Sequence, residues 1–422
     1  MRVLKIVPGT GEGFLCENCL RDQALIARLG AMGHDVLVVP IYLPMPDALT
    51  NVDAPAPPFY GAARVYLEHR FPVFKRAPQY LKRWLDSPPV LRMAGRLSGM
   101  SSSRNLGALT LSVLRGEHGG QAAELETLCN WLRDTRRHPD VIHLSNALLL
   151  GMARRLKDTL NAPVICSLQD EDTWIDAMPE PVASRIWTEA RARVPDVSGF
   201  ITASRYYADK ILPRLAIPPC LARVVHPCID ASHGTQPQPG DRNAPPAWNV
   251  LIDPDDPASL RLILRAFADA RQNPSCANLR LHCSGVPRGR RRLDTGMRRC
   301  ARLSPLITNA GERLAFIRAA TVFTVLHRSD VAFDLSLLDA MASGIPVLQP
   351  NSGANPEILA LADGGVMFEP GNAEALSEAL ARLLGDPPRL AALAQRGRQN
   401  VATRFSLDRM AQATVAAYQS KA

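Results

Sequence analysis

The chain has 422 residues and a mass of 46.0 kDa, which is too long for one ordinary hydrophobic core and fits two domains of about 200 residues each. Apolar residues make up 46% and charged residues 21%, and these globular values exclude a disordered or fibrous chain. The net charge of +9 indicates an anionic partner such as nucleic acid, an anionic membrane surface or an acidic substrate.

The sequence shows no targeting or membrane-spanning segment. The longest apolar stretch, residues 36–45, is about half as long as a bilayer span. The N-terminal residues 1–8, which read MRVLKIVP, are too short and too soon interrupted for a signal peptide. We therefore expect a soluble, cytoplasmic protein, and peripheral binding to the inner membrane face stays open.

The cysteines argue against a disulfide framework and against a metal site. There are nine of them, scattered along the chain. Cys16 and Cys19 form the only CxxC, without the second pair or histidine cluster that a zinc site would need. We expect no metal and no cofactor.

The first half of the chain alternates strand-like and helix-like segments. Residues 3–7 are predicted as a buried strand, followed by a glycine-rich loop at 9–13, a helix at 19–32 and a strand at 36–41. This order is a βαβ unit. Further strands are predicted at 141–144, 164–168 and 199–202, with a helix at 147–156. Residues 1–230 are therefore predicted as a Rossmann-like domain.

The second half repeats this alternation after a proline-rich linker, which we place at residues 231–248. Residues 249–403 are predicted as a second Rossmann-like domain, with strands at 250–252, 279–282 and 321–326. Helices are expected to begin after Asn372 and after Asp386, which have N-cap chemistry. An amphipathic terminal helix is predicted within 404–422, behind a Ser406 cap; its apolar face holds Leu407, Met410, Ala411, Thr414 and Tyr418.

Several motifs carry a resemblance to a known family. Residues 333–347 read FDLSLLDAMASGIPV and residues 351–358 read NSGANPEI. In the first half, residues 19–22 read CLRD, 143–146 read HLSN and 204–209 read SRYYAD. The chain resembles the retaining glycosyltransferases of family 4, in a bacterial branch, over nearly its whole length. The resemblance implies the GT-B fold: two doubly wound α/β domains that face each other across a cleft, with ligands at the carboxyl ends of the strands.

The resemblance also locates the donor site, and this sequence departs from the family there. The arginine and lysine that hold the donor diphosphate fall on Asp253 and Ala258. The second of two family glutamates, which grips the ribose, falls on Asp339. The first falls on Val331, unless Asp330 stands in for it. No lysine or arginine lies between positions 249 and 260.

A third departure lies at the start of the helix that carries this motif. The family glycine is replaced by Asp334, which has the position of an N-cap for the predicted helix 335–343. Its carboxylate would accept the N–H groups that a phosphate would use. Two cations lost and two acids gained imply a penalty of several kcal/mol, about a thousandfold in affinity. Gly11, Gly13 and Glu357 are the remaining donor-side candidates.

Acceptor-side candidates follow strands or match the family stretches of the first domain. Gln169, Glu171 and Asp172 follow a predicted strand and could bind acceptor hydroxyls or supply a general base, or form a solvated acidic turn. His143 could contact a ligand or be a histidine at the edge of the core. The candidates are Arg21, Asp22, His143, Gln169, Glu171 and Asp172.

Two basic segments account for the positive charge. Residues 60–104 interleave aromatic side chains with nine cations against two acids, and seven arginines crowd residues 288–302. The first could receive an anionic or lipid-linked acceptor, lie on a membrane surface, dock a partner chain, or form solvated helices. The second could contact a phosphate or be a solvated face. We do not expect nucleic acid, because no nucleic-acid module is recognisable.

These features predict a glycosyltransferase-like GT-B protein whose standard donor site is degenerate, and hence a non-catalytic or repurposed homologue that acts with a partner protein. The alternative is an active retaining glycosyltransferase with an atypical donor site. In that case Asp339 would bind the ribose, Gly11 and Gly13 would line the donor sugar, and Arg288 or its neighbours would replace the lost cations.

Overall fold

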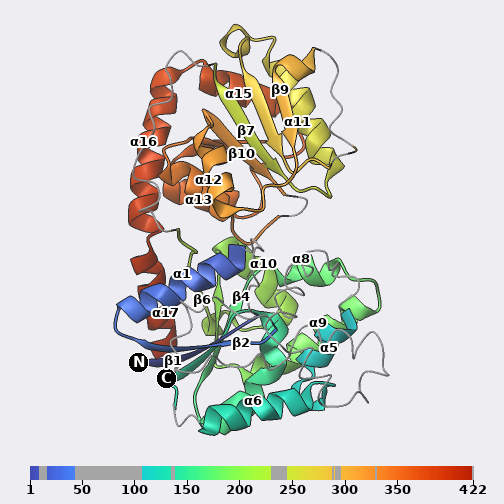
Figure 1. The fold of residues 1–422 in the computed structure, drawn as a ribbon, viewed down its shortest axis with the longest axis vertical. Helices are drawn as coiled ribbons and strands as arrows, with labels where there is room; N and C mark the ends of the chain where they lie inside the picture. The colour runs from blue at the N-terminus through green and yellow to red at the C-terminus, as the bar shows by residue number, and fades with distance from the viewer. Residues whose placement is uncertain are drawn as a thin grey trace. The chain divides into compact units, whose positions relative to one another are not determined.

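The computed structural model describes residues 1–8, 17–42, 107–134, 138–229, 245–287, 289, 296–327 and 330–420. These residues form two compact units (Figure 1). The first unit comprises residues 1–225 and 410–422, and the second comprises residues 226–409.

The first unit is a six-stranded parallel sheet with helices on both faces (Figure 1). Its strand order is β2-β1-β3-β4-β5-β6. The strands are β1 (Arg2–Val7), β2 (Asp35–Pro40), β3 (Val141–Leu144), β4 (Val164–Leu168), β5 (Gly199–Thr202) and β6 (Ala222–Val224). The helices are α1 (Glu17–Ala31), α5 (Gly107–Leu114), α6 (Ala122–Asp134), α7 (Ala153–Leu160), α8 (Glu171–Asp176), α9 (Val182–Arg193) and α10 (Arg205–Leu215).

The second unit has the same architecture, with the strand order β12-β11-β10-β7-β8-β9. The strands are β7 (Ala247–Ile252), β8 (Arg280–Ser284), β9 (Ala301–Ser304), β10 (Val322–Leu326), β11 (Val347–Pro350) and β12 (Gly365–Phe368). The helices are α11 (Pro257–Ala270), α12 (Ala310–Arg318), α13 (Leu335–Ala342), α14 (Asn355–Ala362), α15 (Ala373–Leu384) and α16 (Pro387–Arg404). The core of this unit contains Trp248 and Phe267, both fully buried.

The strands predicted from apolar runs are confirmed, and runs such as those of β1, β3 and β10 are buried, as expected for strands covered on both faces of a parallel sheet. The predicted strand at 279–282 is β8, in which Arg280 is exposed. Four short strands, β6, β9, β11 and β12, were not predicted from the alternation. The predicted helix 147–156 instead begins as a 3-10 turn, η5 (Ala147–Met152), and continues as α7. The two predicted N-caps are confirmed: Asn372 accepts the Ala375 N–H and Asp386 accepts the Arg389 N–H, each at 3.0 Å.

The terminal helix is α17 (Leu407–Gln419), and its residues from 410 onward cluster with the first unit. The predicted face is confirmed at Met410, Ala411, Thr414 and Tyr418, all of which are buried. The predicted linker stays a prediction over residues 231–244, which lie outside the described residues, and β7 begins at its position 247.

None of the helices in the described ranges has the length and apolar character needed to cross a bilayer.

Candidate functional site

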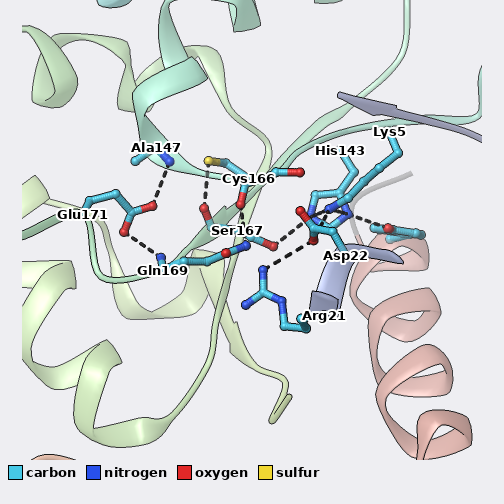
Figure 2. A network of polar contacts seen from close by, with 11 residues as sticks. Lys5, Arg21, Asp22, His143, Ala147, Cys166, Ser167, Gln169 and Glu171 are labelled. Atoms are coloured by element: carbon cyan, nitrogen blue, oxygen red, sulfur yellow. Dashed lines mark hydrogen bonds and ion pairs between the residues drawn. The ribbon is translucent and has the colours of Figure 1, made fainter. Parts of the chain in front are cut away.

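A buried network of charged side chains lies on one face of the first sheet (Figure 2). Lys5 on β1 stands opposite His143 on β3 in the parallel register, so both side chains project to the same face. The Lys5 side chain is 1% exposed, and its Nζ lies 3.2 Å from Asp22 Oδ1 on α1. Arg21 adds a second cation, with Nη2 3.5 Å from the same oxygen. The Asp22 carboxylate thus partners two cations.

His143 connects three elements of the first unit. Its Nδ1 lies 2.6 Å from the Tyr418 hydroxyl on α17, and its Nε2 lies 2.8 Å from Ser167 Oγ on β4. Burial, and then the charges of Lys5 and Arg21, hold the pKa of His143 well below its usual value, so the imidazole is neutral. Both ring nitrogens therefore serve internal hydrogen bonds, and His143 is a buried histidine that ties α17 to the sheet.

Glu171 is also buried and fully occupied. Its Oε1 accepts the Ala147 N–H at 2.9 Å, and its Oε2 accepts the Gln169 N–H at 2.6 Å and the Tyr207 hydroxyl at 2.9 Å. These bonds hold the start of η5 and the loop after β4 in place. Burial raises the pKa of Glu171. Asp172 is held by Lys210, with Nζ 2.6 Å from Oδ2.

The alternative of a solvated acidic turn does not hold for Gln169, Glu171 and Asp172, because these side chains are buried and contact groups from other elements. Gln169 donates to the Ser145 carbonyl oxygen at 2.5 Å. The acceptor-side candidates are brought together in the first unit, in a network that positions the carboxyl ends of β3 and β4.

Replacing Glu171 with glutamine is expected to lower the free energy of unfolding by about 1–2 kcal/mol at pH 7, because the amide nitrogen would face an N–H donor. Burial raises the folded-state pKa of Glu171 above its usual value of 4.5, so folding favours the protonated carboxyl. The stability that this shift contributes is fully present below pH 4.5 and is lost as pH rises through the folded-state pKa. The gap between wild type and variant should therefore widen on acidification. Urea unfolding at pH 5 and pH 7 measures it, with exposed Glu180→Gln as the control. A gap independent of pH would contradict the raised pKa.

The second unit places Asp334 at the N-terminus of α13, as predicted. Its side chain is 1% exposed and accepts the Ser336 N–H at 2.8 Å. The His327 imidazole lies 2.6 Å from the other carboxylate oxygen. Burial alone would raise the pKa of Asp334, but the charge and hydrogen bond of His327 and the Ser336 N–H together lower it. Asp334 is therefore a buried anion.

Asp253 and Asp256 shape the other helix start at this edge of the sheet. Asp253 follows β7 directly, and its Oδ1 accepts the Asp255 N–H at 2.9 Å. Asp256 caps α11 by accepting the Ala258 N–H at 2.9 Å. β7 pairs with β10 in parallel, so the helices that follow these neighbouring strands, α11 and α13, begin at the same edge of the sheet. Both helices begin at an aspartate cap.

An arginine and a histidine accompany the acids of the second unit. Arg313 on α12 is 8% exposed, and its Nη2 lies 3.5 Å from Asp339 Oδ2. His226 lies 2.7 Å from Glu357 Oε1 and packs edge-on against Phe405. Of the predicted donor-side residues, Asp339 is therefore ion-paired with Arg313, and Glu357 contacts the His226 imidazole.

Sequence reasoning missed Lys5, Tyr207, Arg313 and His327. A signal existed for two of them: Lys5 is a charged residue in the middle of a predicted buried strand, and His327 directly follows a predicted strand. Gly11, Gly13, Arg288 and the basic segment 60–104 lie outside the described residues, so their predicted roles stay predictions. The described residues hold no group of three or more His, Cys, Asp or Glu side chains that could bind a metal ion.

Comparisons with known proteins define the class. Residues 113–233 match the family described as Glycosyltransferase Family 4, and residues 254–386 match the family described as Glycosyl transferases group 1. Together with the two parallel sheets, these matches confirm the resemblance seen in the sequence to glycosyltransferases with the GT-B fold.

Among curated relatives, a D-inositol 3-phosphate glycosyltransferase of Rhodococcus opacus is 26% identical over 279 residues, 62% of this chain and 60% of the relative. An MMP alpha-(1->4)-mannosyltransferase of Mycolicibacterium hassiacum is 33% identical over 110 residues, 26% of each chain. The matched part is thus less than two thirds of either relative.

Among solved structures, Anabaena Alr3699/HepE in complex with UDP superposes with a TM-score of 0.63 at 13% identity, over 100% of both chains. The sucrose-phosphate synthase of Thermosynechococcus elongatus superposes with a TM-score of 0.61 at 17% identity, over 99% of this chain and 98% of its own. These structures share the fold with this chain.

Proposed function

We propose that this chain is a repurposed glycosyltransferase homologue, which does not itself transfer sugar from a nucleotide-sugar and acts with a partner protein. The observation that carries the proposal is the buried carboxylate of Asp334 at the N-terminus of α13. A donor phosphate would need the N–H groups that this carboxylate engages, and it carries the same sign of charge.

The start of α11 supports the same conclusion. Its cap is Asp256, Asp253 precedes it, and no lysine or arginine lies between positions 249 and 260. The two helices that follow the neighbouring strands β7 and β10 thus both begin at an aspartate. A diphosphate, with about two negative charges, would need cations at these positions. We place the partner, or a lipid-linked acceptor, at the basic segment 60–104.

Titration of UDP and GDP into the full chain by calorimetry tests the proposal. We expect dissociation constants weaker than about 1 mM, since removing two charge-assisted contacts and adding two like charges costs several kcal/mol. Micromolar binding of either nucleotide would overturn the proposal. UDP-glucose and GDP-mannose are titrated in parallel, so that a donor recognised through its sugar is also detected.

A second candidate is an active retaining glycosyltransferase with an atypical donor site. It is favoured by Arg313, a cation beside Asp339, and by His327, whose imidazole contacts Asp334. Relatives named as mannosyltransferases, such as the MMP alpha-(1->4)-mannosyltransferase, make mannose the sugar to try first. Release of GDP from GDP-mannose, dependent on added acceptor and lost in Arg313→Gln, would favour this candidate.

A further inference from the structure

The positive charge of the chain is concentrated in two segments, one of which the structure largely describes. Residues 271–307 contain nine arginines, no lysine and one aspartate, a net charge of +8. Residues 60–104 carry a net charge of +7, so the rest of the chain is acidic, with a net charge of −6. The basic character is therefore a property of particular segments of the chain.

The described part of residues 271–307 includes one edge of the second sheet. β9 is the edge strand, and it pairs in parallel with β8 so that Arg302 stands opposite His282 (Figure 1). Because side chains alternate along a strand, Arg280, His282 and Arg302 project to one face. Leu281 and Cys283 point to the other face, where they belong to the buried core.

Three arginines on this edge have exposed side chains. Arg280 and Arg302 are exposed, as is Arg299 in the turn η11 (Met297–Arg299) that leads into β9. None of these three arginines forms an ion pair with a carboxylate in the part of the chain that the structure describes. Burial, and then the charges of Arg302 and Arg280, lower the pKa of His282. Arg280 and Arg302 therefore place positive charge beside His282 on this face of the sheet.

An exposed apolar side chain lies on the same edge. Leu306 follows β9, and at 49% exposure it is the most exposed of the large hydrophobic side chains among the described residues. Leu306 lies past the carboxyl end of β9, and Arg280 and Arg299 lie near its start. Cations and an exposed apolar side chain along one edge fit an anionic bilayer, which attracts the charges and accepts the apolar side chain between its headgroups. A nucleic-acid phosphodiester backbone would attract the charges but would offer no apolar contact for Leu306.

We propose that the β8–β9 edge of the second unit, formed by Arg280, Arg299, Arg302 and Leu306, docks this protein on an anionic lipid bilayer. The proposal is independent of whether the chain binds nucleotides. Each arginine near an anionic leaflet contributes about a fivefold factor in binding. Attraction to phosphatidylglycerol headgroups orients the second unit with this edge toward the bilayer.

The test is flotation of the full chain with vesicles of phosphatidylcholine, alone or in an equal mixture with phosphatidylglycerol. We expect binding to the mixed vesicles only, and its loss at about 1 M salt, where the Debye length is about 3 Å. Arg280→Gln/Arg302→Gln should bind about 25-fold more weakly. Arg280→Lys/Arg302→Lys should retain binding, which shows that a loss in the first variant is not a folding defect.

The matched control is Arg261→Gln/Arg404→Gln, which removes the same charge from exposed positions elsewhere in the second unit. It should bind mixed vesicles within about twofold of wild type, because charges beyond a Debye length are screened. Leu306→Ser should weaken binding severalfold without a change in charge.

Three outcomes would overturn the proposal. Equal losses in the two glutamine variants would mean that overall charge, or another segment, binds the lipid. Binding of heparin or duplex DNA that exceeds vesicle binding and is lost in Arg280→Gln/Arg302→Gln would identify a polyanion site. Unchanged vesicle binding together with self-association of that variant would show that the arginines instead protect the β9 edge from strand pairing.

Discussion

Replacing Asp22 with asparagine is expected to lower the free energy of unfolding of the first unit by about 3–5 kcal/mol. The Lys5 side chain is 1% exposed and that of Asp22 is 6% exposed, so water cannot compensate the charge that remains. Arg21 shares the same carboxylate, and the neutral His143 offers Lys5 no opposite charge. Hydrogen exchange of the β1 and β3 backbone amides measures the free energy of unfolding of the first unit separately from that of the second.

A double-mutant cycle separates the charge from the packing. Lys5→Met together with Asp22→Asn should recover most of the lost stability, because an apolar side chain of similar volume replaces the uncompensated cation. Burial lowers the pKa of Lys5, and in Asp22→Asn it loses the carboxylate that opposes this effect. The penalty is therefore full below the folded-state pKa of Lys5 and is relieved as pH rises toward its usual value. A loss below about 1 kcal/mol at pH 7 that does not change with pH would contradict a charged Lys5.

The fold was predictable because its signals are local. Apolar runs such as residues 36–39 and 164–166 are buried on both faces, and aspartate at a helix start is a cap whatever surrounds it, so Asp334 and Asp386 were placed correctly. β9 was missed because an edge strand reads ARLS, with exposed Arg302 in place of a buried side chain. Sequence patterns therefore predict the elements whose signals, apolar runs and helix caps, lie in residues close together along the chain.

The site was predictable in position but not in chemistry. Glu171 was singled out because it follows a strand, yet its state depends on Ala147 and Tyr207, which reach it from η5 and α10. Asp339 was singled out from the motif, but its partner Arg313 lies 26 residues away on another helix. Ion pairing and burial arise from tertiary contacts, so the sequence alone could not show that these carboxylates are already occupied.

Restoring the family residues is expected to create nucleotide binding in the second unit. The variant Asp253→Arg/Ala258→Lys/Asp334→Gly should bind UDP or GDP about a thousandfold more tightly than wild type, since it returns two charge-assisted contacts and removes two like charges. Ala258 is exposed, so a lysine there meets no steric barrier. Loss of the Asp334 cap should lower stability by only about a few tenths of a kcal/mol, because glycine is tolerated at an N-cap. Calorimetry measures the affinity, and a thermal melt verifies the fold.

The gain in nucleotide affinity should depend on where the substitutions lie and not only on the added net charge. The control variant Asp269→Arg/Ala277→Lys/Glu374→Gln raises the net charge by the same amount, at positions away from the helix caps of α11 and α13. It should leave nucleotide affinity unchanged, because these charges lie in solvent and are screened. Asp334→Asn keeps the cap and removes its charge, so it isolates the anion at α13. If Asp334→Asn alone restores most of the affinity, the buried carboxylate of Asp334 is what closes this site to a diphosphate. If the triple variant gains nothing, the donor pocket differs in shape as well as charge, and an occupied Asp339 beside Arg313 becomes the group to change next.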